Sequence, residues 1–210
     1  MVHGLAPYGV RGALWYQGES NGSEGVSYFH KMQALVNGWR KVWGQGDFPL
    51  YFYFVQLADF QLPNDNPAGG DGWAKLREAQ LHSLKIPHTG MAVITDVGAA
   101  NDIHPRNKQD VGHRLALWAL RDVAKKDVVP SGPLFKEIKV ESSAIRVHFE
   151  HAANGLIVGA RKKGLEPTQE VKDGTLKRFA IAGEDKLIMT TPANRRIDAW
   201  HLRVGPVLLS

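Results

Sequence analysis

The stretch that most constrains the fold is "LYFYFVQLA" at residues 50–58, where hydrophobic side chains occupy almost every position. Aromatic and β-branched residues favour extended backbone, and their succession without polar alternation predicts a strand buried on both faces. Two comparable apolar stretches, at 9–16 and 89–98, lie before and after it. Strands of this kind belong to a sheet that is covered on both sides, which is the usual environment of parallel strands.

Amphipathic helices are predicted between and after these three strands. Segment 27–43 carries apolar residues at helical spacing, and segments 73–86 and 107–126 are also predicted to be helical. Asn107 is expected to cap the last helix, with Asp110 three residues later as its capping-box partner. Strands that alternate with helices predict an α/β fold in which a parallel sheet carries helices on both faces.

The pattern changes after the Pro- and Gly-containing linker "VVPSGPL" at 128–134. Segment 135–150 alternates apolar and polar residues around a turn, and "LKRFAIAGEDKLIM" at 176–189 has the form strand–turn–strand. We therefore expect an α/β portion over 1–127 and a β-rich C-terminal segment over 135–210.

Composition and charge exclude several classes of site. The chain has no cysteine, which rules out disulfides, thiolate metal sites and cysteine nucleophiles. Its formal net charge is +5, but the basic residues are not densely clustered with aromatic ones, so we expect no nucleic-acid partner. No long apolar run predicts a membrane span, and the N-terminus lacks the pattern of a signal peptide. No histidine pair has HExxH spacing, so no metal site is predicted.

Two polar loops, at 17–26 and 96–106, follow predicted strands and should lie at the carboxyl edge of the sheet, where α/β proteins bind ligands. Asp102 and His104 stand two residues apart in the second loop. A histidine oriented by a carboxylate is what general-base activation of a hydroxyl requires. The alternative interpretation is that both residues only hydrogen-bond to the loop backbone.

The first loop contains "WYQGESN", in which Ser20 is a candidate nucleophile. Neighbouring groups are candidates for oxyanion stabilisation or substrate binding: Gln17, Gly18, Glu19 and Asn21. Arg77 and Gln80 share one face of the helix over 73–86 and are candidates to reach the same cleft. A polar turn that caps the next helix, and ordinary solvated side chains, are the alternative interpretations.

Several stretches resemble the sialate O-acetylesterases, carbohydrate acetylesterases of the SGNH hydrolase superfamily. They are "GVRGALWYQGESN", "LYFYFVQLADF", "WAKLREAQ" and "NDIHPRNKQDVGHRLALWAL", within a resemblance that covers roughly residues 1–185. The resemblance implies a three-layer α/β/α fold and an enzyme that removes O-acetyl groups from sugars by serine ester chemistry, without a metal or other cofactor. Family members are often secreted or periplasmic; the sequence itself fixes no compartment.

The resemblance also implies roles for individual residues. The histidine of "DIHP", His104, matches the catalytic histidine, and Gln17 matches a contributor to the oxyanion site. Asp102 is expected to orient His104, through its carboxylate or its backbone carbonyl. The superfamily's usual spacing is D-x-x-H, and position 101 is Asn, so Asp96 is a second candidate for the acid.

The nucleophile leaves two interpretations open. The family carries its serine in a "GQSN"-type motif upstream of "WYQGE", and this chain, which resembles a C-terminal portion of the family, has no such motif. In the first interpretation the 210 residues form a self-contained esterase with Ser20 as nucleophile. In the second the chain is a truncated, catalytically silent module that binds acetylated sugars. The second also implies a sheet without its first strand or two, with an apolar edge that a homo-oligomer would cover.

Overall fold

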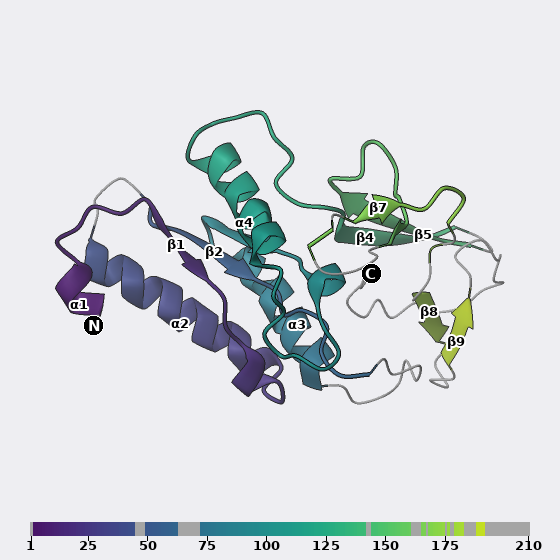
Figure 1. Cartoon of the computed structure of the whole chain (residues 1–210), viewed down its shortest axis with the longest axis horizontal. Helices are drawn as coiled ribbons and strands as arrows, with labels where there is room; N and C mark the ends of the chain where they lie inside the picture. The colour runs from purple at the N-terminus through teal and green to yellow at the C-terminus, as the bar shows by residue number, and fades with distance from the viewer. Residues whose placement is uncertain are drawn as a thin grey trace.

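The computed structural model describes most of the chain up to residue 191. The described residues are 2–44, 49–62, 72–141, 144–160, 165–166, 168–174, 176, 179–182 and 188–191. The end of the expected β-rich segment, 192–210, lies outside them. Figure 1 shows an α/β region, which contains the N-terminal half of the chain, beside a set of antiparallel strand pairs.

Three parallel strands form the sheet of the α/β region. They are β1 (Gly12–Trp15), β2 (Tyr51–Val55) and β3 (Thr89–Ala92), in the order β1-β2-β3. The predicted parallel sheet is therefore confirmed, with β2 at its centre. The third strand ends earlier than predicted, because the chain turns into the 3-10 helix η3 (Thr95–Val97) three residues after Ala92.

The connecting helices lie close to their predicted positions. After the short α1 (Val2–Leu5) come α2 (Val26–Trp43), α3 (Gly72–His82) with the 3-10 turn η2 (Ser83–Lys85), and α4 (Lys108–Asp122). The Asn107 side chain accepts a hydrogen bond from the Asp110 backbone N–H, which confirms the predicted cap of α4. Among the described residues, no helix is long and apolar enough to cross a membrane.

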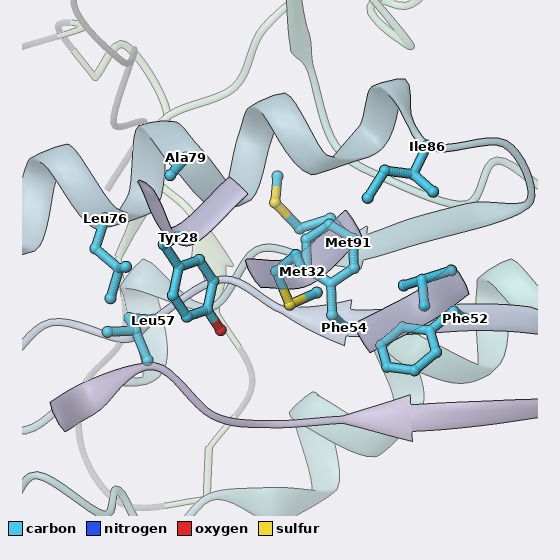
Figure 2. Close-up of a cluster of buried hydrophobic side chains, with 10 residues drawn as sticks. Tyr28, Met32, Phe52, Phe54, Leu57, Leu76, Ala79, Ile86 and Met91 are labelled. Carbon is cyan, nitrogen blue, oxygen red and sulfur yellow. The ribbon is translucent and has the colours of Figure 1, made fainter. Parts of the chain in front are cut away.

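The central strand explains the continuous apolar pattern of "LYFYFVQLA", because its alternate side chains enter two separate cores. Phe52 and Phe54 lie in the core shared with α2 and α3, and Tyr53 and Val55 lie in the core shared with α4. Figure 2 shows the first core, formed by Tyr28, Met32, Val36, Phe52, Phe54, Leu57, Leu76, Ala79, Ile86 and Met91. Helices on both faces make this the predicted three-layer α/β/α arrangement.

The C-terminal segment consists of antiparallel strand pairs. These are β4 (Leu134–Glu141) with β5 (Ala144–Glu150), β6 (Gly159–Ala160) with β7 (Gln169–Glu170), and β8 (Phe179–Ala182) with β9 (Ile188–Thr191). The two hairpins predicted from the alternating patterns are confirmed as β4–β5 and β8–β9.

Candidate active site

The carboxyl ends of the three parallel strands bring three segments to one edge of the sheet. We call residues 16–25, after β1, the β1 loop, and residues 93–107, after β3, the β3 loop; residues 56–62 follow β2 between them. The backbone N–H of Gln61 donates to the carbonyl oxygen of Ala100 at 2.9 Å. A Cβ on Gly98 would lie 2.7 Å from that of Asp59 and closer still to its backbone, so these segments are tightly packed.

A chain of hydrogen bonds holds the β1 loop to helix α2. The Tyr28 hydroxyl lies 3.0 Å from the Gln17 backbone oxygen and 3.1 Å from its Oε1. Gln17 Nε2 donates to Asn21 Oδ1 at 2.6 Å, and Asn21 Nδ2 donates to Glu24 Oε1 at 2.8 Å. Lys31 completes the chain with an ion pair to Glu24 at 2.6 Å. The conformation of the loop is therefore specified by its own side chains and by one helix.

The protonation states of Tyr28 and Glu24 suit the hydrogen bonds that these two side chains form. Burial raises the pKa of Tyr28, so its hydroxyl keeps the proton that it donates. Hydrogen bonds from Lys31 and Asn21 lower the pKa of Glu24, which therefore remains an ionised acceptor.

Gln80 connects the β1 loop to the end of β2. It is only 1% exposed. Its Oε1 accepts from the Leu57 backbone N–H at 2.9 Å, and its Nε2 donates to the backbone oxygens of Val55 at 3.2 Å and Gln17 at 3.4 Å. Gly18 adopts φ 148° directly against it, and a Cβ there would lie 3.1 Å from Gln80 Nε2. A side chain at position 18 would therefore be both strained and crowded.

Arg77, like Gln80, binds backbone groups just after β2. Its guanidinium donates to the backbone oxygens of Leu57 at 2.9 Å and Ala58 at 2.8 Å, and to Asp59 Oδ1 at 2.7 Å. Arg77 is 4% exposed, so the interpretation of Arg77 and Gln80 as solvated surface residues is wrong. Both instead satisfy backbone groups where β2 ends and the loops begin.

The structure places Ser20 within the 3-10 helix η1 (Glu19–Asn21), with its side chain exposed. Glu19 is half-buried, and its charge acts on the neighbouring Tyr16. In the part of the chain that the structure describes, no hydrogen bond joins Ser20 to His104.

In the β3 loop, Asp102 Oδ1 accepts a hydrogen bond from the His104 backbone N–H at 2.9 Å. The Asp102 backbone N–H itself donates to the Ala99 oxygen at 3.2 Å, which closes a small turn. The His104 side chain is exposed, and the next residue, Pro105, is buried. The Asp102 carboxylate thus fixes the backbone that carries the His104 imidazole. This is the hydrogen bond to the loop backbone that the alternative interpretation of Asp102 expected.

Asp96, the second candidate for the acid, forms an ion pair with Arg114 of α4. Its two carboxylate oxygens each accept from Arg114 at 2.6 Å, and Oδ2 also accepts from Thr168 Oγ1 at 2.9 Å. Burial raises the pKa of Asp96, but the hydrogen bonds and charge of Arg114 outweigh it and hold that pKa below the ordinary value. This ion pair ties the β3 loop to α4, and it leaves Asp102 as the carboxylate that contacts His104.

Tyr16 of the β1 loop contacts Lys108, which directly follows the β3 loop. Tyr16 is the first residue after β1, and Lys108 is the first residue of α4. The Lys108 Nζ lies 4.5 Å from the centre of the Tyr16 ring, within the range of a cation–π interaction. The first residue of α4 is therefore held against the residue that precedes Gln17.

The chemical groups at this edge are an imidazole, carboxylates, a hydroxyl, side-chain amides and backbone N–H groups. Such groups transfer protons and stabilise developing negative charge, as acyl transfer requires. Within the described residues, no group of three or more His, Asp or Glu side chains is gathered in a way that could hold a metal ion.

A sequence model of the carbohydrate esterases described as sialic acid-specific acetylesterases matches residues 3–121. The chain belongs to this family. The match contains β1, β2, β3 and the two loops at their carboxyl ends. The architecture is accordingly that of an SGNH-type α/β hydrolase.

Individual members of the acetylesterase family are similar over most of this chain. The sialate O-acetylesterase of Mus musculus is 35% identical over 158 residues, which cover 68% of this chain and 29% of the mouse protein. That of Homo sapiens is 32% identical over 155 residues, with coverages of 67% and 29%. A crystal structure of a carbohydrate acetylesterase from Xanthomonas citri superposes with a TM-score of 0.75 and 36% identity, covering 94% of this chain and 43% of that one. The chain thus spans less than a third of the length of these curated relatives.

Several residues that organise this edge of the sheet were not identified from the sequence. Tyr28 shares an apolar helix face with Met32, which predicts core packing but not a hydroxyl aimed at Gln17. Thr168 reaches Asp96 from 72 residues away in the β-rich segment, and no local pattern predicts such a contact.

Proposed function

We propose that this chain hydrolyses O-acetyl esters of carbohydrates by serine-type chemistry. One observation carries the proposal: the β1 loop, with Gln17 and Gly18, and the β3 loop, with His104, flank the end of β2 at one edge of the sheet. Membership of the sialic acid-specific acetylesterase family supports the same reaction and the same class of substrate.

In the proposed reaction, His104 takes the proton of a serine hydroxyl as its oxygen attacks the acetyl carbonyl carbon. Collapse of the tetrahedral intermediate breaks the bond to the sugar oxygen, which receives the proton from His104. Water, deprotonated by His104, then attacks the acetyl-enzyme, releases acetate and restores the serine. Asp102 would position His104 through the turn that its carboxylate fixes.

The oxyanion of the intermediate would be stabilised from the β1 loop. The Gln17 side-chain amide has two N–H groups and donates one to Asn21, so the second is free for the substrate. Among the described residues, the Gly18 backbone N–H forms no hydrogen bond either. Gln80 and Tyr28 would hold both donors in position, and preorganised donors are what this step requires.

The proposal is tested by hydrolysis of p-nitrophenyl acetate. His104→Ala should reduce the rate by on the order of 10³-fold or more, because the base and the acid of the reaction are the same residue. An equal rate in the variant would exclude His104 from the chemistry. Ser20→Ala should cause a similar loss if Ser20 is the nucleophile, and a mild loss would assign attack to a different hydroxyl.

A second candidate function is an acetyl-sugar-binding module without turnover. The exposed position of Ser20 and its lack of a hydrogen bond to His104, both described residues, favour this alternative. Calorimetric titration with an acetylated sugar separates the two functions. Binding without release of acetate at any protein concentration supports the module, and release of acetate that depends on His104 supports the esterase.

A further inference from the structure

The β-rich C-terminal segment contacts the β3 loop through Thr168. The Thr168 hydroxyl donates to Asp96 Oδ2 at 2.9 Å, although the two residues lie 72 positions apart in the sequence. Asp96 belongs to η3, near the start of the β3 loop, and its carboxylate also forms the ion pair with Arg114 of α4. The same carboxylate is therefore bound both from α4 and from the β-rich segment.

Strand pairing and packing set the direction of the Thr168 hydroxyl. Thr168 directly precedes β7, in which Gln169 pairs with Ala160 of β6. A Cβ on Gly159 would lie 2.6 Å from Thr168 Cγ2, so the methyl group is seated where only a glycine leaves room for it. Cγ2 and Oγ1 are bonded to the same carbon and turn together about χ1. The packing of the methyl group against Gly159 therefore also aims the hydroxyl at Asp96.

The β3 loop connects Asp96 to His104 through short-range hydrogen bonds. Ala99 lies three residues after Asp96, and its backbone oxygen accepts from the Asp102 backbone N–H at 3.2 Å. Asp102 Oδ1 in turn accepts from the His104 backbone N–H at 2.9 Å. A displacement of Asp96 would therefore shift the turn that carries the imidazole.

We propose that Thr168 is a positioning residue for the reaction. By binding Asp96 from the β-rich segment, Thr168 holds the β3 loop in the conformation in which His104 acts as base. This role rests on the proposed function, and it makes the β-rich segment a contributor to catalysis through the loop alone. A general base must lie within hydrogen-bond reach of the proton that it takes, so a small shift of the loop lowers the rate of the chemical step.

The test starts from Thr168→Val, which exchanges the hydroxyl for a methyl group of similar size. With p-nitrophenyl acetate as substrate, kcat should fall on the order of tenfold while KM changes less than about twofold, because only the position of the base is altered. Thr168→Ser keeps the hydroxyl and should restore most of kcat. Gln169→Val, at the next exposed position of the same segment, is the matched control and should leave both constants at their wild-type values.

Gly159→Ala tests the same contact without removing a hydrogen-bonding group. The added Cβ would displace Thr168 Cγ2 and turn the hydroxyl away from Asp96, so kcat should fall as in Thr168→Val. The double variant Gly159→Ala with Thr168→Ser lacks the methyl group that meets the new Cβ, and its kcat should recover. A double variant no faster than Gly159→Ala alone would contradict this account of the packing.

Hydrogen exchange followed by mass spectrometry gives a readout that does not depend on activity. Exchange in peptides that cover residues 96–107 should be about threefold faster or more in Thr168→Val than in the wild-type chain, and close to wild type in Thr168→Ser. Unchanged exchange in Thr168→Val, or an unchanged kcat, would overturn the proposal. A wild-type chain that releases no p-nitrophenol would refute the esterase instead, and exchange would still decide whether Thr168 holds the loop.

Discussion

The β1 loop and the β3 loop lie at the same edge of the sheet but are held in different ways. The β1 loop is held by a series of hydrogen bonds that runs from Tyr28 of α2 through Gln17 and Asn21 to Glu24. The β3 loop is anchored at its two ends, by the Asp96–Arg114 ion pair and by the Asn107 cap, while His104 between them is exposed. The first loop therefore has a fixed conformation and the second carries an exposed imidazole, so each loop should respond differently to mutation.

The largest effect on stability is expected where the β3 loop packs against the segment after β2. Gly98→Ala places a Cβ 2.7 Å from the Asp59 Cβ and closer to its backbone, which the packed edge cannot accommodate without moving. We expect a loss of about 3 kcal/mol in the free energy of unfolding, measured by urea denaturation. Gly112→Ala, in α4 with open space around it, is the control and should be neutral or slightly stabilising. Equal effects at the two positions would contradict this account of the edge.

Tyr28→Phe should remove the support that α2 gives to the β1 loop. The change leaves the Gln17 backbone oxygen and Oε1 without the hydroxyl that they share, at a cost of about 2 kcal/mol. His104→Ala, at an exposed position in the other loop, should alter stability by less than about 0.5 kcal/mol. The same urea experiment measures both variants, and comparable losses would show that the two loops are supported alike.

Arg114→Met should loosen one end of the β3 loop in a pH-dependent way, with a loss of roughly 1.5 kcal/mol at pH 7. The folded-state pKa of Asp96 is lowered, since the effect of Arg114 outweighs that of burial. The pair therefore stabilises the fold above the unfolded pKa of about 4, and this stabilisation is lost as the pH falls through the lower folded-state pKa. Thermal melts of both proteins from pH 7 to pH 3 should converge at the acid end. A difference that stays constant over this range would rule out the ion pair as its source.

The smallest effect is expected at Lys31, the outermost member of the β1-loop chain. Its ion pair with Glu24 is largely exposed, so Lys31→Met should shift the denaturation midpoint by no more than the error of the measurement. A clear loss at low salt that disappears at high salt would instead show that this ion pair itself stabilises the fold.

Much of the α/β architecture could be predicted from local patterns. The apolar run over 50–58 indicated a strand with two buried faces, and β2 has side chains in both cores. The predicted cap at Asn107 and the hairpin β4–β5 are present as well. Such features depend on side-chain periodicity and on contacts between residues close in sequence, which is why a single sequence contains the information.

Local patterns also indicated the two loops, because parallel strands must end at the same edge. They did not indicate which side chains support the loops. Arg77 and Gln80 are polar residues on a helix, and nothing in their spacing distinguishes a solvated face from one buried against backbone carbonyls. The roles of Ser20 and His104 in catalysis remain predictions.

Periodicity and composition are enough to predict the succession of strands and helices along the chain, the cap of α4 and the residues available for chemistry. The partners of these residues follow only from the folded arrangement: Asp96 with Arg114 and Thr168, Gln80 with Gln17, and Lys108 with Tyr16. The physical reason is that hydrogen bonds and ion pairs act over a few ångströms, so a partner is chosen by the fold that brings distant segments together. For the candidate site, this choice placed the Lys108 ammonium against the Tyr16 ring.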